Sequence, residues 1–132
     1  MNKPFDEIRY TEVIEACSLV SDFNTLTHGD QTLIGDRGVN LSGGQKARVS
    51  LARAAYSQAD IYLFDDPLSA VDANVRLHLF NNCINGLLRD KARVLVTHQL
   101  HIIDSADYVI CLDKGLVACE GTFDQVASNE TY

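Results

Sequence analysis

The sequence predicts an α/β fold with a parallel sheet. Three short apolar runs rich in strand-forming residues lie at 61–64, 93–97 and 108–112, with helix-like stretches between them. Polar residues bound the first run, and the others repeat the pattern, which is typical of strands that are buried on both faces. Because strands and helices alternate, we expect right-handed crossovers that leave the strands parallel.

The first part of the chain is predicted to be helical up to a glycine-bearing loop. Apolar residues recur at helical spacing over 5–26, and a break is expected near Ser18. Residues 27–38 are polar and contain glycine, so they are expected to form the loop.

Three further helices are predicted after this loop. Asn40 or Ser42 is expected to cap the first of them, which should end near Tyr56. The other two are expected at about 71–88 and 100–105, between the strand-like runs.

The end of the chain is predicted to be a hairpin followed by a short helix. The tripeptide at 113–115 is expected to turn the third strand back into a fourth, antiparallel one. Thr122 is expected to cap the closing helix with Gln125 at its third position, which is the reciprocal capping arrangement.

The composition indicates one compact domain. The chain has 132 residues, 46% of them hydrophobic, which is enough for a real core. Its net charge of −7, with no basic stripe, argues against nucleic acid as a partner. The four cysteines form no C-x-x-C pair and show no metal spacing, so we expect them to be buried thiols of a reducing compartment.

The stretch LSGGQ at 41–45 has the form of a phosphate socket. It leads directly into a predicted helix, whose exposed first-turn N–H groups and positive dipole end both favour an anion. Chains that hydrolyse nucleotides usually carry a second loop, G-x-x-x-x-G-K-[ST], for their own ATP. No Gly-Lys pair occurs in the 132 residues, which leaves open whose phosphate the socket holds.

Polar residues follow two of the predicted strands. Asp65 and Asp66 come after the first, and Thr97 and His98 after the second, where ligands bind in open parallel sheets. Two adjacent carboxylates call for a cation, and Mg²⁺ held by one carboxylate and by phosphate oxygens meets that need. The alternative is a plain turn, since an acidic pair followed by Pro67 is also good loop chemistry.

Taken in order, four motifs resemble those of the ATP-binding cassette (ABC) family. LSGGQ (41–45), IYLFDDP (61–67), SAVD (69–72) and LVTHQ (95–99) are similar to its signature motif, Walker B strand, D-loop and switch histidine. Two longer stretches, IGDRGxxLSGGQKARVxLARA and DIYLxDDPLSAVDA, resemble the first nucleotide-binding domain of C-subfamily transporters, the multidrug-resistance-associated proteins. The resemblance extends from about Phe5 to the end of the chain.

This resemblance implies a more specific fold. The chain would hold the carboxyl-terminal half of a P-loop (RecA-like) ATPase sheet together with part of the ABC helical subdomain. Residues 1–57 would be the subdomain part, with the signature motif and its helix. Residues 58–132 would be the carboxyl-terminal part of the ATPase core.

The resemblance also implies the cofactors, ATP and Mg²⁺, and residues that contact them. In this family two cassettes pack head to tail, and the signature turn of one closes over the γ-phosphate of ATP held by the other. Ser42 would offer its hydroxyl, Gly43 and Gly44 their backbone, and Gln45 a contact near the ribose. Glycine is expected there because a Cβ would hold the backbone away from the phosphate.

The remaining site residues are implied in the same way. Asp65 would hold Mg²⁺, usually through water, and His98 would contact the γ-phosphate. Ser69 and Asp72, which belong to the D-loop, would lie at the nucleotide. Asp66 stands where the family's catalytic glutamate usually polarises the attacking water. Aspartate is one methylene shorter, which implies a site that holds ATP more than it hydrolyses it.

A second departure concerns the P-loop and the glutamine loop, which in the family precede the region that this chain resembles. We therefore expect the isolated chain to bind ATP very weakly. We also expect it to be a fragment, a splice form or a truncated gene product.

The resulting expectation is a partial nucleotide-binding domain of an ATP-driven membrane exporter of organic solutes. Its partners would be a second nucleotide-binding domain and the transmembrane domains of the same transporter, with this domain on the cytoplasmic side of the membrane. One alternative is a non-catalytic regulatory or remnant cassette piece that binds a partner domain. A soluble DNA-maintenance ATPase is disfavoured, because the sequence has neither a heptad arm nor a basic face.

Overall fold

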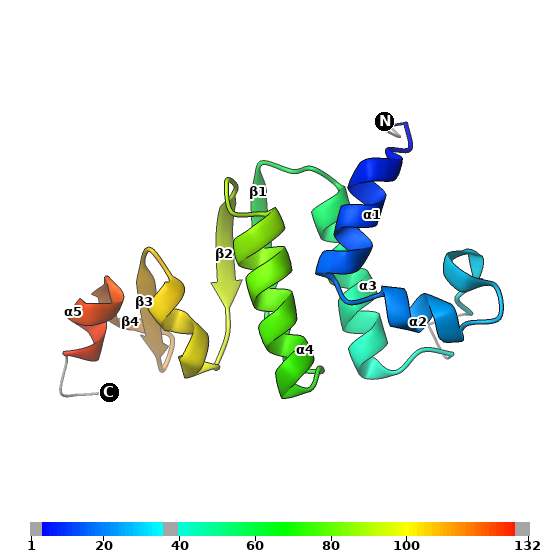
Figure 1. Cartoon of the computed structure of the whole chain (residues 1–132). Helices are drawn as coiled ribbons and strands as arrows, with labels where there is room; N and C mark the ends of the chain where they lie inside the picture. The colour runs from blue at the N-terminus through cyan, green and yellow to red at the C-terminus, as the bar shows by residue number, and fades with distance from the viewer. Residues whose placement is uncertain (1–3, 36–39, 129–132) are drawn as a thin grey trace. The chain divides into compact units, whose positions relative to one another are not determined.

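The structure is a computed structural model that describes residues 4–35 and 40–128 (Figure 1). The chain forms two compact units, Met1–Val96 and Thr97–Tyr132. The sequence analysis expects a different division, into a subdomain part (1–57) and a core part (58–132). That division is functional, and it stays a prediction.

Two short helices open the first unit, as the apolar spacing predicts. They are α1 (Glu7–Ala16) and α2 (Val20–Thr25). Ser18 lies between them with a φ of 56°, a left-handed conformation that interrupts the helix at the predicted residue. Asp6 caps α1, because its carboxylate accepts a hydrogen bond of 3.0 Å from the backbone N–H of Arg9.

The described part of the predicted loop contains a short 3-10 helix, η1 (Gly29–Gln31). Residues 36–38 of that prediction lie outside the described residues. The next helix, α3 (Gly43–Tyr56), ends where predicted and is capped by Ser42, not by Asn40. It packs on α1, and the Arg9 guanidinium donates a 2.8 Å hydrogen bond to the last-turn carbonyl of Ala55.

A pair of parallel strands follows, as predicted. They are β1 (Ile61–Asp65) and β2 (Ala92–Val96). The chain between them forms α4 (Ala73–His78), which continues as η3 (Leu79–Leu87) with π-helical hydrogen bonding (Figure 1). The observed helices lie within the predicted span of 71–88.

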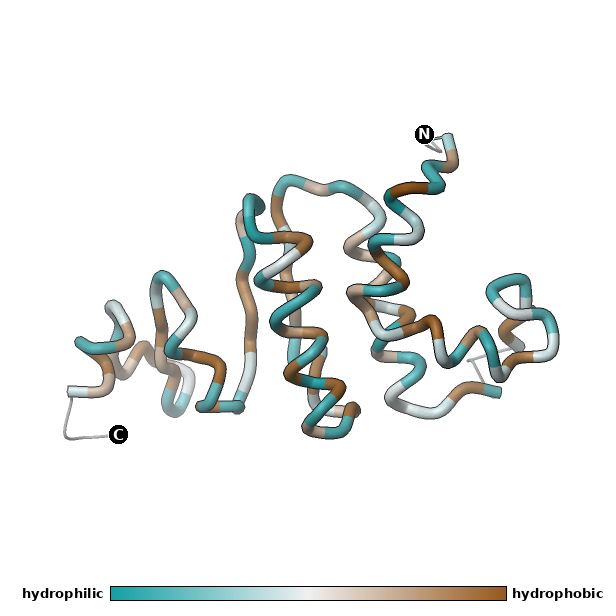
Figure 2. Tube along the Cα trace, viewed as in Figure 1, coloured by the Kyte–Doolittle hydropathy of each residue, from teal (hydrophilic) through white to brown (hydrophobic). Residues whose placement is uncertain are grey.

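The core of the first unit lies between the helices and one face of these strands. Tyr62 and Phe64 are buried on β1, and Arg93 of β2 donates hydrogen bonds to the Ile84 carbonyl and to the Asn85 side chain of η3. Figure 2 shows apolar positions recurring along the helices of this unit, the pattern of elements with one packed side. The buried residues of η3 are Leu79, Phe80, Cys83 and Ile84.

The other face of the two strands is exposed, so the prediction of strands buried on both faces is wrong. Ile61 and Leu63 of β1 are 65% and 77% exposed, and Val94 and Val96 of β2 are 56% and 57% exposed. In the described part of the chain, burial alternates along β1, because only the side that faces the core is packed.

The second unit contains a short helix, a hairpin and a closing helix. These elements are η4 (Leu100–Ser105), β3 (Val109–Asp113), β4 (Leu116–Gly121) and α5 (Phe123–Ala127). Lys114 and Gly115 form the hairpin turn with φ angles of 47° and 80°, the left-handed values that a two-residue turn requires. Thr122 caps α5 reciprocally with Gln125, as predicted.

The third predicted strand forms as β3, and its parallel arrangement with the first two stays a prediction. Within the second unit, β3 pairs with β4 in an antiparallel arrangement, as the hairpin prediction requires. The apolar run at 108–112 predicts a strand, and a strand forms, but the run carries no information about which neighbour it pairs with.

The cysteines divide into two pairs. Cys17 and Cys83 are buried in the first unit with their sulfur atoms 3.6 Å apart, and hydrogen bonding to Cys83 together with burial raises the pKa of the Cys17 thiol. Cys111 and Cys119 lie opposite each other in the hairpin and are only half-buried. All four are free thiols, so the prediction of buried thiols is right for the first pair and wrong for the second.

Candidate functional site

The stretch expected to be the phosphate socket forms the start of α3. The Ser42 hydroxyl accepts a hydrogen bond from the backbone N–H of Gln45 at 3.2 Å, and the Gln45 side-chain oxygen accepts one from the backbone N–H of Ser42 at 2.9 Å. This is a complete capping box, and it explains why the helix begins at Gly43.

The capping box leaves three hydrogen-bond donors at this end of the helix. The Ser42 hydroxyl accepts one bond and keeps its own hydrogen for donation. Among the described residues, the backbone N–H groups of Gly43 and Gly44 have no partner, because first-turn amides lie beyond the reach of the helix's own carbonyls. Ser42 and Gly43 are exposed, so an anion can reach this helix end.

Gln45 has less freedom than the sequence prediction assumes. Its oxygen accepts from Ser42, and its side-chain Nε2 donates to the Asp22 carboxylate at 3.1 Å. The amide keeps one hydrogen and one lone pair for another partner. A contact with a ribose therefore stays a prediction, and it would have to be made by an amide that is already held on both sides.

An ion pair that sequence reasoning missed stands behind this turn. Arg48, one turn further along α3, donates to both carboxylate oxygens of Asp22 on α2 at 2.7–3.0 Å. No local signal marks the pair, since the two residues are 26 positions apart. The sequence places Asp22 in a helix with an apolar face, and only the fold brings it to α3.

Gly44 has a structural reason to be glycine besides the one expected from the sequence. A Cβ at this position would lie 3.1 Å from the backbone oxygen of Ala70 and 3.6 Å from Val71 Cγ1. A Cβ at Gly43 would meet only the Ala70 Cβ, at 3.9 Å. The start of α3 therefore packs closely on the segment 69–72, and a side chain at position 44 would be tightly confined by the Ala70 backbone.

The two carboxylates lie at the end of β1, in different surroundings. Asp65 is exposed and is the last residue of the strand, while Asp66 is half-buried and starts the turn that follows. Asp66 has a φ of 44°, a left-handed conformation that aspartate tolerates better than most residues. Its backbone N–H donates to the Val96 carbonyl at 2.9 Å, which ties the turn to β2.

A hollow of about 270 Å³ opens beside these carboxylates, between α3 and the end of β1. It is lined by Ala47, Ser50, Leu51, Ala54, Leu63, Phe64, Asp65, Asp66, Pro67, Ser69 and Ala70. The helix that carries the predicted socket and the strand that carries the predicted metal ligand thus share one cavity within the first unit.

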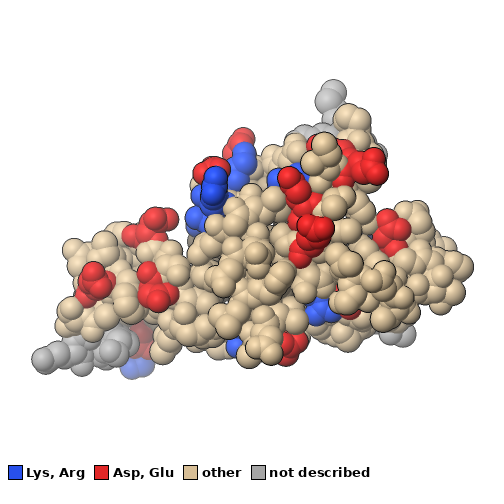
Figure 3. Space-filling view, in the orientation of Figure 1, with Lys and Arg blue, Asp and Glu red and all other residues tan. Residues whose placement is uncertain are grey.

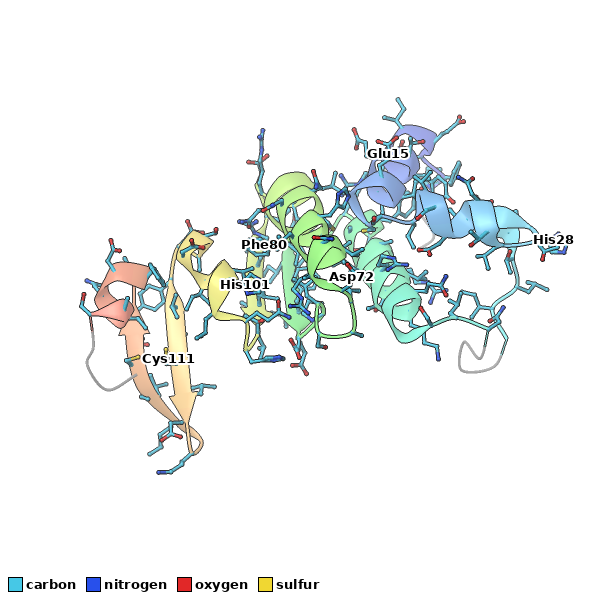
Figure 4. All side chains as sticks on the ribbon, turned by 60° about the horizontal axis from the view of Figure 1, so that its bottom comes forward. Glu15, His28, Asp72, Phe80, His101 and Cys111 are labelled. Atoms are coloured by element: carbon cyan, nitrogen blue, oxygen red, sulfur yellow. The ribbon has the colours of Figure 1, made fainter. Side chains whose placement is uncertain are left out.

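Both predicted contact residues of the segment 69–72 have roles inside the protein. The Ser69 hydroxyl donates to the backbone carbonyl of Asp66 at 2.9 Å and so helps to hold the left-handed turn. Asp72, labelled in Figure 4, caps α4 by accepting from the backbone N–H groups of Asn74 and Val75, both at 3.1 Å. Any contact of Ser69 or Asp72 with a nucleotide stays a prediction.

His98 belongs to the second unit and is exposed just before η4. The neighbouring Thr97 hydroxyl accepts a hydrogen bond from the backbone N–H of Gln99 at 3.1 Å, which shapes the turn that carries the histidine. A contact of His98 with a γ-phosphate stays a prediction, because it depends on groups outside the second unit.

The first unit therefore combines a helix end able to receive an anion with a parallel strand that ends in adjacent carboxylates. This combination is typical of an α/β nucleotide-binding domain. The sequence model of the ABC transporter family matches residues 8–69, which include α3 and β1. The chain belongs to the ABC transporter family.

Curated relatives agree with this assignment. The chain is 52% identical over 124 residues to ABC transporter C family member 2 of Dictyostelium discoideum, which covers 94% of this chain and 9% of the relative. It is 53% identical over 123 residues to ATP-binding cassette sub-family C member 4 of Homo sapiens, covering 93% and 9%. Probable non-intrinsic ABC protein 5 of Arabidopsis thaliana is 50% identical over 126 residues, which are 96% of this chain and 39% of that relative.

These shares show that the chain spans about a tenth of the length of the C-family relatives. Within the described residues, no helix has both the length and the apolar character needed to cross a membrane.

Proposed function

We propose that this chain works as the carboxyl-terminal part of the first nucleotide-binding domain of a C-subfamily ABC exporter of organic solutes. It contributes the signature motif, the Walker B carboxylates and the switch histidine to ATP binding and hydrolysis at the interface of two cassettes. The observation that carries this proposal is the capped start of α3, which offers the Gly43 and Gly44 amides and the Ser42 hydroxyl hydrogen to an anion.

The phosphate at this helix end belongs to ATP bound by the other cassette. In the full-length protein, a G-x-x-x-x-G-K-[ST] loop outside these 132 residues would hold a separate ATP at this domain's own site. Ser42, Gly43 and Gly44 contact the γ-phosphate, and Gln45 lies near the ribose. The positive end of the helix dipole adds to the attraction for the phosphate charge.

The strand end serves this domain's own composite site. Asp65 fits one ligand position of Mg²⁺, because among the described residues no side chain pairs with its exposed carboxylate. The ion, when bound, neutralises charge on phosphate oxygens. Asp66 faces the attacking water, His98 contacts the γ-phosphate, and Ser69 and Asp72 keep the connecting turn in place. Because Asp66 is short, this site holds ATP more than it hydrolyses it.

The proposed partners are a second nucleotide-binding domain, packed head to tail, and the transmembrane domains of the same transporter. The domain would then lie on the cytoplasmic side of a membrane, and residues 1–57 and 58–132 would be the subdomain and core parts. On the face seen in Figure 3, acidic side chains are spread widely and the basic ones form no stripe. The expectation that nucleic acid is not a partner rests on the net charge of the sequence and stays a prediction.

A second candidate is a regulatory cassette piece that is not joined to membrane segments. The observation in its favour is the relative named a probable non-intrinsic ABC protein, of which this chain covers a larger share than it does of the C-family relatives. Fractionation of cells decides between the two. Release of the native protein by a salt wash favours the regulatory piece, and release only by detergent favours the transporter.

A substitution at the helix end tests the first proposal. In the full-length protein, Ser42→Arg should abolish ATP-driven transport, because the long side chain occupies the place of the phosphate that the other cassette holds. Photolabelling of this domain's own nucleotide site by an ATP analogue should persist. Ser57→Arg is the matched control, since it places the same side chain at the other end of α3, where a positive charge is favourable. Normal transport by Ser42→Arg contradicts the proposal.

A further inference from the structure

The ion pair between Asp22 and Arg48 joins α2 to the first turns of α3. Both side chains are 13% exposed, so the pair is largely withdrawn from water. Arg48 donates through Nε and Nη2, at 3.0 Å and 2.7 Å, to the same carboxylate oxygen, and Nη2 also lies 2.9 Å from the other oxygen. Such a contact fixes the carboxylate in both position and orientation, as a lysine could not.

The fixed carboxylate is connected to the helix cap through one amide. Gln45 Nε2 donates to Asp22 Oδ1 at 3.1 Å, and Gln45 Oε1 accepts from the Ser42 N–H at 2.9 Å. Only one orientation of the Gln45 side-chain amide satisfies both contacts. If it turned over, its NH₂ would face the Ser42 N–H and its oxygen would face the carboxylate.

We propose that Asp22 is a positioning residue for the turn at 42–44. Its carboxylate, locked by Arg48, sets the orientation of the Gln45 amide, and that amide holds the Ser42 backbone so that the hydroxyl and the Gly43 N–H face outward. The consequence for ATP rests on the proposed function of this turn, whereas the positioning itself is a property of the chain alone.

Arg48 has a second task in this arrangement. Asp22 reaches Gln45, the residue that closes the capping box, so an unpaired carboxylate here would repel a phosphate at the helix end. The guanidinium cancels that charge while leaving an acceptor oxygen for Gln45. Asp22 can therefore lie near the anion site without repelling the anion.

A charge reversal separates positioning from simple stabilisation. In the double variant Asp22→Arg with Arg48→Asp, the ion pair can form again, but position 22 presents donors to Gln45. The amide must then turn its oxygen to the arginine and release the Ser42 N–H. Thermal unfolding should recover from the low midpoint of Asp22→Ala, whereas protection of the Ser42 amide against hydrogen exchange should stay at least about tenfold below that of the native chain.

The chain contains its own control for this measurement. Thr122 and Gln125 form the same capping box at α5, with the Thr122 N–H donating to Gln125 Oε1 at 2.9 Å. Among the described residues no acidic side chain is hydrogen-bonded to Gln125, so Thr122 protection should be equal in all variants. Asp22→Asn should keep most of the Ser42 protection, because the asparagine oxygen still accepts from Gln45.

Two outcomes overturn the proposal. One is unchanged Ser42 protection in Asp22→Ala, and the other is recovery of that protection together with stability in the charge-reversed variant. In the full-length protein the charge-reversed variant should need about tenfold more ATP for half-maximal hydrolysis. If Ser42 protection falls while the ATP dependence stays the same, the positioning is supported and the proposed function of the turn is contradicted.

Discussion

Gly44→Asp is expected to abolish ATP-driven transport by the full-length protein while ATP labelling of this domain's own site persists. Two effects act together. The new Cβ would lie 3.1 Å from the Ala70 backbone oxygen, which forces α3 or the segment 69–72 to shift. The new carboxylate would also add a negative charge close to the helix end where the phosphate of the other cassette is proposed to bind. Transport assays and photolabelling of the same membranes measure both quantities.

Alanine substitutions separate the packing effect from the charge effect. Gly43→Ala adds a methyl group that meets only the Ala70 Cβ, at 3.9 Å. Because alanine favours helix over glycine, the free energy of unfolding should be unchanged or raised by up to about 1 kcal/mol. Gly44→Ala should lower it, because the backbone of Ala70 must give way. Equal stability of the two variants would contradict the packing that the structure assigns to Gly44.

The second large effect is expected at Asp66. If the short carboxylate limits hydrolysis, Asp66→Glu in the full-length protein should raise single-turnover hydrolysis at the composite site that this domain completes. A displacement of about 1 Å at a reacting group can change a rate on the order of 10²-fold. The opposite site is disabled for this measurement, so that only one site contributes. An unchanged rate would mean that carboxylate reach does not limit this site.

Asp66→Glu should also make the protein less stable. Asp66 has a φ of 44°, a left-handed conformation that is less favourable for glutamate than for aspartate. Asp66→Glu should therefore lower the free energy of unfolding by up to about 1–2 kcal/mol. Asparagine also tolerates the left-handed conformation, so Asp66→Asn should leave the free energy of unfolding nearly unchanged. Total ATP turnover should change little as well, because the opposite site is expected to carry most of it. A large fall in total turnover for Asp66→Asn would identify Asp66 as a working general base.

Asp65→Asn serves as the comparison for the Asp66 series. It removes the charge proposed to face Mg²⁺, so hydrolysis at this site should fall whichever residue occupies position 66. Because Asp65 is exposed at the strand end, thermal stability should be nearly unchanged.

Features determined by neighbouring residues could be predicted from the sequence. The break at Ser18, the Lys114–Gly115 turn and the Thr122–Gln125 capping box depend on side chains within three residues of the backbone that they shape. At α3 the sequence predicted only that Asn40 or Ser42 is the cap, and the reciprocal bond from Gln45 was missed. The carboxylates at the end of β1 were likewise predictable, because a strand's end is marked by its own sequence.

Features that depend on distant partners were not predictable in the same way. An apolar run such as 61–64 indicates a strand, but whether one or both of its faces are covered depends on other elements. Asp22 escaped notice because its partners Gln45 and Arg48 are 23 and 26 residues away. The close approach of Gly44 to Ala70 joins two motifs that the sequence shows only one after the other.

The central claim is that the start of α3 meets a phosphate held by another cassette. Photocrosslinking tests it most directly, with the full-length protein and an ATP analogue that carries a reactive group on its γ-phosphate. We predict that label reaches residues 41–45 and that it persists when the P-loop lysine of this domain is replaced by alanine. The label should disappear when the P-loop lysine of the second cassette is replaced. Label on residues 41–45 that depends on this domain's own lysine would contradict the proposal that this turn meets the phosphate of the other cassette.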